Sequence, residues 1–365
     1  MSKKGKFFLI IVGILFGSVL FYGYKIIDSY RTSAVLEAAI TPTSIPPTPS
    51  PVRPALYKSV FVPYWVEWDN EPKPEGYDRV IYFGVDADIN GINKQDAGYL
   101  NMPKFISYIS NEGEKWITIR MTDSDKNTEV LDAKTSWKQI VNDVIAITRD
   151  NNFKGVVLDF EISALPFKDI TQKISEFQKF VGSEMKRNNI PYAVAIYGDS
   201  FYRSRPYEIQ KIAENASEIM VMAYDFHKSR GEPGPNFPFE GKEKYGYDFK
   251  TMLNDYMQVV PSDKLSIIYG MFGYNWMVDE KQRPIRPAVA MSLNEIKKTY
   301  IEKCVWKNCI VKRNEKSDEV EINYIDEYLN YHVVWYEDYR SVEKKLGYML
   351  EKGIGKYTYW TWGYF

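Results

Sequence analysis

Two acidic residues at the end of an apolar segment are the strongest candidates for chemistry in this chain. Asp159 and Glu161 follow Gly155–Leu158, an apolar run that predicts a fully buried strand. Side chains two apart on a strand point to the same side, about 7 Å apart along the chain. Two carboxyl groups held this close cannot both ionise freely, so one is expected to keep its proton near neutral pH. A proton donor beside a charged neighbour is what cleavage of a glycosidic bond requires. The alternative is a solvated acidic turn after a core strand.

Composition and charge exclude several other classes of function. Lys and Arg number 47 and Asp and Glu number 48, so the charge balance gives no case for a nucleic-acid partner. The chain has only two histidines, His227 and His332, which excludes a multi-histidine metal site and favours a structural role for each. We expect no metal, no cofactor and a monomer. Aromatic residues make up 16% of the chain, and they are equally suited to a sugar-binding groove or to a core.

The N-terminal segment has the pattern of a membrane anchor. Residues 1–6 include three lysines, and Phe7–Tyr24 carries no charge over a length that can cross a bilayer as a helix. The lysines favour a cytoplasmic N-terminus. No small-x-small cleavage site directly follows the apolar run, so we favour an uncleaved signal anchor at 7–24 in the cell membrane, with the rest of the chain outside. Secretion after cleavage of a signal peptide is the alternative.

Residues 25–56 are expected to connect this anchor to a folded domain. Within them, residues 41–54 are rich in Pro, Thr and Ser and lack the apolar content of a core. Such a segment stays extended as a stiff spacer. It would hold the following domain away from the membrane.

Strand-like and helix-like segments alternate through residues 57–365. Eight strands in this pattern predict a closed parallel (β/α)8 TIM barrel. A doubly wound open sheet is the alternative, but it would usually show a glycine-rich first turn, which is not found near Trp65. The connection from Glu67 to Asp78 is rich in Pro and is expected to lack a helix. The candidate strands are Ser59–Trp65, Arg79–Val85, Lys115–Arg120, Gly155–Phe160, Tyr192–Tyr197, Glu218–Ala223, Leu265–Met271 and Tyr357–Trp360.

The alternation breaks at 277–333, which we interpret as a small α+β insertion after the seventh barrel strand. It contains a helix-like run at Leu293–Glu302 and an alternating strand pattern at Val320–Tyr324. Between them lie Cys304 and Cys309. If the domain is exported, these two are candidates for a small disulfide, with free thiols as the alternative. Without a nearby histidine they make a poor zinc site.

The functional groups of such a barrel lie where its strands end. Acids and aromatic residues stand at these positions on separate strands, and their convergence on one mouth favours a functional site over a solvated turn. The residues at the strand ends are Tyr64, Trp65, Asp159, Glu161, Tyr224, Asp225, Tyr274, Trp276 and Trp360.

Several of these segments resemble family 18 of the glycoside hydrolases, the chitinase-like barrels. That family's fourth-strand signature, D-G-x-D-x-D-x-E, aligns with 154–161; the last Asp and the Glu are present, and Lys154 and Val157 replace the first two acids. The family's Met-x-Tyr-Asp signature matches 222–225. With valine at 157, Asp159 lacks an acidic partner beneath it and is expected to depend on Glu161 or on a hydroxyl group.

Two further segments are similar to the spore-cortex and cell-wall branch of the family, and a third is similar to the family as a whole. HKSRGEPGPNFPF at 227–239 looks like its Pro-Gly-Pro loop. GMFGYNW at 270–276 is similar to its Tyr-Gly-Tyr-Asp-Trp segment, with Asn275 replacing the Asp. Residues 335–360 resemble the last helix and strand of the family. The resemblance covers roughly 57–365, and several motifs in the right order are more specific than any one of them.

The resemblance implies a mechanism in which the substrate supplies the nucleophile. Glu161 would protonate the leaving oxygen and later activate water, while the substrate's own 2-acetamido group attacks the anomeric carbon. Asp159 and Tyr224 would hold that acetamido group, Asp225 would support the sugar or the acids, and Trp360 would stack on the sugar ring. The remaining expected sugar contacts are Tyr64, Trp65, Tyr274 and Trp276.

The expected partner is a polysaccharide containing N-acetylglucosamine, with peptidoglycan favoured over chitin. The hypothesis is therefore a retaining hydrolase of β-1,4-linked glycans at the outer face of the membrane. A barrel that binds glycans without cutting them is the alternative, although family members that lost catalysis usually lost the Glu that this chain keeps as Glu161.

Overall fold

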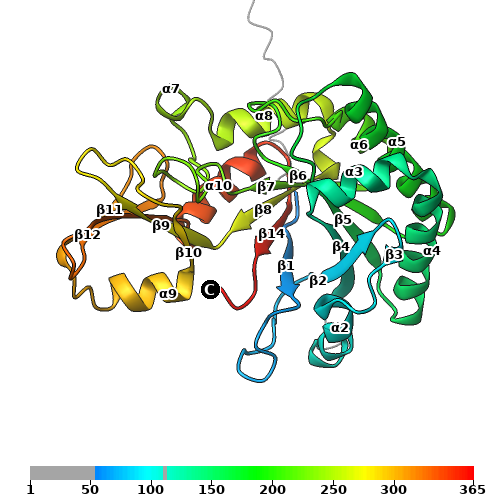
Figure 1. The fold of residues 1–365 in the computed structure, drawn as a ribbon, viewed down its shortest axis with the longest axis horizontal. Coiled ribbons are helices and arrows are strands. Elements are labelled where there is room, and N and C mark those ends of the chain that lie inside the picture. The colour runs from blue at the N-terminus through cyan, green and yellow to red at the C-terminus, as the bar shows by residue number, and fades with distance from the viewer. Residues whose placement is uncertain (1–53, 110–112) are drawn as a thin grey trace, which may run out of the picture. The chain divides into compact units, whose positions relative to one another are not determined.

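Residues 54–109 and 113–365 are described in this computed structural model, and they build a closed barrel of parallel strands with an inserted antiparallel sheet (Figure 1). The predicted anchor at 7–24 and the linker up to residue 53 lie outside the described residues. Within the described ranges, no helix combines the length and apolar character needed to cross a bilayer.

Eight parallel strands close the barrel because β1 pairs with both its neighbours, β2 and β14. Ser59 of β1 lies opposite Arg79 on one side and Thr358 on the other. β5, β7 and β8 are buried at every position, as expected for parallel strands covered on both faces. The predicted TIM barrel is thus confirmed. Its strands are β1 (Tyr57–Pro63), β2 (Arg79–Asp88), β4 (Glu114–Met121), β5 (Gly155–Phe160), β6 (Tyr192–Tyr197), β7 (Glu218–Ala223), β8 (Leu265–Gly270) and β14 (Lys356–Trp360). The short β3 (Gly91–Ile92) pairs antiparallel with the end of β2.

Amphipathic helices cover the outside of the barrel (Figure 1). α5 buries a helical stripe that includes Ile174, Phe177, Val181 and Met185, the spacing from which the helix was predicted. Aspartate side chains cap the first turns of α2, α3, α8 and α10. As expected, no helix lies between β1 and β2. The helices are α2 (Ala97–Tyr108), α3 (Ser124–Asp132), α4 (Lys134–Asp150), α5 (Lys168–Arg187), α6 (Ile209–Asn215), α7 (Lys242–Tyr245), α8 (Phe249–Val259), η1 (Ser262–Lys264) and α10 (Tyr339–Glu351).

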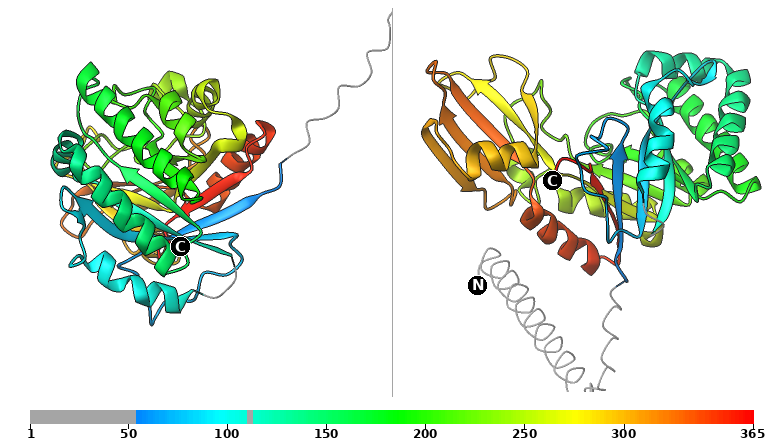
Figure 2. Two further views of the ribbon diagram at one scale, coloured as in Figure 1. Left: turned by 90° about the vertical axis from the view of Figure 1, so that its right-hand side faces the viewer. Right: turned by 90° about the horizontal axis from the view of Figure 1, so that it is seen from below.

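The insertion is a five-stranded antiparallel sheet that lies beside the barrel (Figure 2). It begins before residue 277 and ends after residue 333, so it is longer at both ends than predicted. At its start, Met271 alone separates β8 from the first inserted strand, and no turn residue marks the boundary. In the order β10-β9-β13-β12-β11, its strands are β9 (Phe272–Val278), β10 (Val289–Ser292), β11 (Lys307–Arg313), β12 (Val320–Ile325) and β13 (Tyr331–Tyr336), with α9 (Leu293–Ile296) and the π-helical turn η2 (Lys297–Ile301) between β10 and β11.

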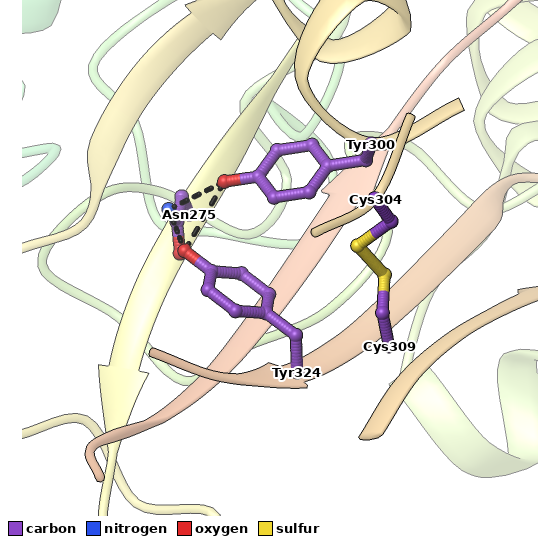
Figure 3. Close-up of a disulfide and its surroundings, with 5 residues drawn as sticks. All are labelled: Asn275, Tyr300, Cys304, Cys309 and Tyr324. Atoms are coloured by element: carbon purple, nitrogen blue, oxygen red, sulfur yellow. Dashed lines mark hydrogen bonds between the residues drawn. A yellow bond between two sulfur atoms is a disulfide. The ribbon is translucent and has the colours of Figure 1, made fainter. Parts of the chain in front are cut away.

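A disulfide and a polar cluster fix the outer part of this insertion (Figure 3). Cys304 and Cys309 are joined, with their Cα atoms 6.4 Å apart. Nearby, the amide of Asn275 donates to the hydroxyl groups of Tyr300, at 3.1 Å, and Tyr324, at 2.9 Å. Asn275, which replaces an acid of the related segment, therefore has a structural role.

A buried ion pair crosses the barrel at the end opposite its mouth. Arg79, at the start of β2, donates to both carboxylate oxygens of Glu218, at the start of β7, at 3.0 and 2.7 Å. Arg79 is 1% exposed and Glu218 is 4% exposed. The Nε of Arg79 also donates to the Ser59 hydroxyl at 3.0 Å. A charge this deeply buried is tolerated only while its partner is present.

Replacing Arg79 alone should therefore destabilise the barrel strongly. Arg79→Met leaves the Glu218 carboxylate buried without a partner, and we expect the free energy of unfolding to fall by about 3–5 kcal/mol. The double variant Arg79→Met/Glu218→Met removes both charges and should recover part of that loss. Urea unfolding followed by tryptophan fluorescence measures both. A single variant as stable as the wild type would contradict the assigned role.

Candidate active site

The mouth of the barrel holds a cavity of about 350 Å³. Residues at the C-terminal ends of several barrel strands line it, together with residues of the inserted sheet. The two predicted acids, Asp159 and Glu161, share this cavity with Tyr224 and Trp360, as the sequence indicated. The full lining is Phe83, Thr122, Asp159, Glu161, Tyr197, Met222, Tyr224, Asp225, Lys228, Phe272, Tyr274, Ala290, Trp360 and Tyr364.

The acidic pair has raised pKa values because it is removed from water. Burial raises the pKa of Asp159 well above its usual range, and the neighbouring Glu161 charge raises it further. Burial also raises the pKa of Glu161, while a hydrogen bond from Tyr197 and the charge of Lys228 oppose this shift. The pair consequently keeps a proton at higher pH than two solvated carboxyl groups would.

Asp159 has an unused acceptor in this cavity. It is 6% exposed, and its Oδ1 has no hydrogen-bond partner. Beneath it, Val157 is fully buried among apolar residues of the barrel interior, including Phe61 and Met220. The sequence analysis expected either Glu161 or a hydroxyl group to support Asp159, and no hydroxyl group bonds to its Oδ1. A buried acceptor without a partner costs free energy, and an N–H group of a bound molecule would satisfy it.

Tyr197 is a site residue that the sequence analysis missed. Its hydroxyl group donates to a carboxylate oxygen of Glu161. The guanidinium of Arg205 lies 3.7 Å from the centroid of its ring and is itself paired with Asp199 at 2.6 Å. Tyr197 is the last residue of β6, so the strand-end rule, applied to this strand as well, would have found it.

Aromatic rings form one side of the cavity. The rings of Tyr224 and Trp360 are stacked, with centroids 6.4 Å apart and an interplanar angle of 18°. Trp65 packs edge-on against Trp360 at 6.2 Å and is 43% exposed, so it lies beside the stack without lining the cavity. Tyr64 also lies outside the lining, where its ring packs against Arg120 at 5.1 Å.

Asp225 is held in place from two directions. Tyr274 of the inserted sheet donates to its Oδ1 at 2.7 Å. Its backbone has a φ of 58°, a left-handed conformation that is unfavourable for most residues, and its N–H donates to the Asn236 side chain at 2.8 Å. Burial raises the pKa of Asp225, opposed first by the hydrogen bond from Tyr274. Both predicted residues, Asp225 and Tyr274, thus lie in the site and contact each other.

Trp276 does not lie in the site, and its predicted contact with sugar is wrong. Its side chain is fully buried, and the indole N–H donates to the Gly231 carbonyl at 3.0 Å. It packs with other buried residues of the insertion, such as Val333 and Trp335. The loop after β7 packs over this end of β9 and buries Trp276. The sequence around Trp276 does not indicate this contact.

The two histidines have structural contacts. The Nδ1 of His227 lies 2.7 Å from the Pro235 carbonyl, and His332 contacts Asn275 and Asp326. In the part of the chain that the structure describes, no three His, Cys, Asp or Glu side chains are grouped so that they could hold a metal ion.

A parallel barrel with paired acids and stacked aromatic rings at its mouth has the features of a barrel glycosidase. The sequence model of the family described as glycosyl hydrolases family 18 matches residues 60–364, and the chain belongs to this family.

Curated relatives of the chain are described as bacterial glycosylases and cortical fragment-lytic enzymes. The chain is 28% identical over 229 residues to the uncharacterized glycosylase YvbX of Bacillus subtilis, covering 61% of each chain. It is 21% identical over 299 residues to the cortical fragment-lytic enzyme of Bacillus anthracis, covering 78% of this chain and 64% of the relative. Overall, the chain spans between 49% and 64% of the length of the curated relatives it matches.

Solved structures share the fold at low sequence identity. The spore cortex-lytic enzyme SleL of Bacillus cereus has a TM-score of 0.65 at 17% identity, covering 86% of this chain and 72% of that chain. Human YKL-39, described as a pseudo-chitinase with retained chitooligosaccharide binding, has a TM-score of 0.69 at 15% identity, covering 84% of this chain and 92% of that chain.

The contact between Tyr197 and Glu161 predicts a change in titration. The hydroxyl group stabilises ionised Glu161 and so lowers its pKa, which means that Tyr197→Phe should raise the Glu161 pKa further. The titration of Glu161, followed by carboxyl ¹³C NMR with Glu161→Gln used for assignment, should move to higher pH.

Tyr192→Phe is the matched control for this measurement. Tyr192 stands at the other end of the same strand and donates to Gln178, away from the acids. Its loss should leave the Glu161 titration in place. A Tyr197→Phe titration that stays in place or moves to lower pH would contradict the assigned contact.

Proposed function

We propose that this protein is a retaining glycosidase that cleaves β-1,4-linked glycans containing N-acetylglucosamine. The observation that carries the proposal is the pair of buried Asp159 and partly buried Glu161, which lines one cavity with the stacked rings of Tyr224 and Trp360. The raised pKa of Glu161 suits a group that must give up a proton near neutral pH.

In the first step, Glu161 protonates the oxygen that bridges two sugars. The oxygen of the substrate's own 2-acetamido group attacks the anomeric carbon, and a cyclic oxazolinium ion forms as the bridging bond breaks. Asp159 supports this step because its unpaired Oδ1 accepts the acetamido N–H, and its ionised form faces the positive charge that develops. One proton shared by the coupled pair is sufficient for this step.

In the second step, Glu161 acts as a base toward water, which opens the oxazolinium ion. Two inversions at the anomeric carbon leave its configuration retained. Tyr224 orients the acetamido group through its hydroxyl, and Trp360 supports the sugar ring by stacking. Asp225, fixed by Tyr274, supports the sugar from the side of the inserted sheet.

Peptidoglycan is the favoured polymer. The names of the relatives refer to lysis of the spore cortex and its fragments. An anchor at 7–24 would hold the barrel at the outer face of the cell membrane, next to the wall; in the alternative, the protein is secreted after signal cleavage. Chitin is the second candidate polymer.

Glycan binding without cleavage is the competing function. Val157 in place of an acid favours it, and one structural neighbour is described as a pseudo-chitinase that still binds chitooligosaccharides. The presence of Glu161 in the cavity, with its raised pKa, favours catalysis.

Glu161→Gln decides between these functions. The amide cannot donate or accept the required proton, so we expect hydrolysis to fall by at least about 10²–10⁴-fold while glycan affinity stays close to that of the wild type. Mass analysis of the products from purified wall glycans and chitin oligomers measures hydrolysis, and calorimetry measures glycan affinity. Glu176→Gln, on the exposed surface of α5, is the control. Full turnover by Glu161→Gln would rule out the assignment.

The use of the acetamido group predicts a specific inhibitor. A stable thiazoline analogue of the oxazolinium ion should inhibit competitively, because Asp159 and Tyr224 are arranged to hold the cyclised group. The same glycan with a hydroxyl group in place of the acetamido group should not be cleaved. NMR of the first product should show the retained anomer. Cleavage of the hydroxyl analogue at the normal rate would indicate a nucleophile supplied by the protein.

A further inference from the structure

Lys228 is the one cationic side chain in the lining of the cavity. It lies in the loop after β7 and is partly buried. Among the described residues, no carboxylate lies within 4.0 Å of its ammonium group, since it is absent from all ion pairs at that distance. A partly buried cation without a partner is costly, and an anionic group of a ligand would offset that cost.

The neighbouring cations are already paired. Arg205 contacts Asp199 at 2.6 Å and Arg203 contacts it at 2.8 Å. The charges of both guanidinium groups are therefore already paired with Asp199. Lys228 differs from them in that it lines the cavity and has no carboxylate within 4.0 Å, although it lowers the pKa values of Glu161 and Asp225 in the same cavity.

The position of Lys228 is fixed close to the proton donor. Its Nζ lies 5.4 Å from the ring centroid of Tyr197, whose hydroxyl group donates to Glu161. Its carbonyl accepts from Gly231 at 2.8 Å, and the next residue, Ser229, accepts from the N–H of Ala288 in the insertion at 2.7 Å. An anion held by Lys228 would thus belong to a sugar at or next to the bond that is cleaved.

We propose that Lys228 binds a carboxylate of the glycan and makes the site selective for acidic N-acetylated glycans over neutral ones. This inference rests on the function proposed above and names its substrate class more closely. In wall glycans, the carboxylate can come from the lactyl ether of the acidic sugar or from a peptide attached to it. A neutral glycan would bury Lys228 without giving it a partner, which is the source of the discrimination.

If the lactyl group is the source, the inference also places the reaction in a sequence. The lactyl carboxylate is free only where no peptide is bonded to it as an amide. An amidase that hydrolyses this lactyl–peptide bond must then act before this protein. The substrate would be a glycan strand stripped of its peptides.

The test compares substrates that differ only in charge. Wall glycan strands with free lactyl carboxylates, the same strands as methyl esters, strands that keep their peptides, and chitin oligomers are cleaved by wild type and by Lys228→Met. We expect the wild type to prefer the free carboxylate over the ester by about 10- to 100-fold in kcat/KM, mainly through KM. Lys228→Met should lose this preference.

Two variants control for charge. Lys228→Arg keeps the cation and should keep most of the preference. Lys242→Met removes one positive charge from the exposed surface of α7, outside the cavity, and should behave as the wild type. Each enzyme is measured across its pH range, because Lys228 also lowers the pKa values of Glu161 and Asp225.

The outcomes separate the alternatives. Equal losses on charged and esterified strands in Lys228→Met would overturn the proposal, since Lys228 would then act only through the pKa of the acids. A wild type that prefers neither the free lactyl strands nor the strands that keep their peptides over the esterified strands would overturn it as well. A preference confined to strands that keep their peptides would support carboxylate recognition and identify the peptide as its source.

Failure of the proposed catalysis is detected separately. Affinities are measured by calorimetry for Glu161→Gln and for Glu161→Gln/Lys228→Met, so that no turnover is needed. If the wild type cleaves nothing while Glu161→Gln binds the free carboxylate more tightly than the ester, the recognition stands and the hydrolase does not. If Glu161→Gln binds the free, the esterified and the peptide-bearing strands equally, the recognition is overturned whatever the activity.

Discussion

The removal of two neighbouring carboxyl groups from water is the constraint on which the chemistry of this structure depends. Asp159 and Glu161 stand at the end of β5 inside the barrel mouth, where burial raises both pKa values. Such burial is unfavourable for folding at neutral pH, because the unfolded chain would ionise both groups freely. The closed barrel supplies the compensating stability, since its eight strands and their covering helices bury most of the apolar residues of the described chain.

The insertion is part of the site as well as an addition to the fold. The backbone N–H groups of Asn236 and Phe237 donate to Glu319, a fully buried residue just before β12, and Glu319 in turn pairs with buried Lys345 of α10 at 3.2 Å. The Asn236 side chain then holds the strained backbone of Asp225. The inserted sheet, the last helix and the loop after β7 therefore act together to fix a carboxyl group beside the cavity.

Features that depend on the local sequence pattern were predicted correctly. Features that depend on contacts with segments remote in the sequence were missed. The barrel and the acids at the end of β5 follow from apolar periodicity and the strand-end rule. Tyr197 obeys the same rule, but only its hydrogen bond to Glu161 distinguishes it from other tyrosines. Trp276 has the local pattern of a site residue, yet a loop more than forty positions earlier in the chain covers it through Gly231. Lys228 lies in a loop whose path the sequence does not define.

Val157 changes how charge is distributed in the site. An acid at this position would place a third carboxyl group against Asp159, among the apolar side chains that now surround Val157. With valine there, the raised pKa of Asp159 has two causes only, burial and Glu161. The pair then retains its proton without a third carboxyl group beneath it to compete for that proton. The groups that lower the pKa of Glu161 are the hydroxyl of Tyr197 first and the cation of Lys228 second. With valine at 157, the proton donation proposed for Glu161 thus depends on burial, on the hydrogen bond from Tyr197 and on the charge of Lys228.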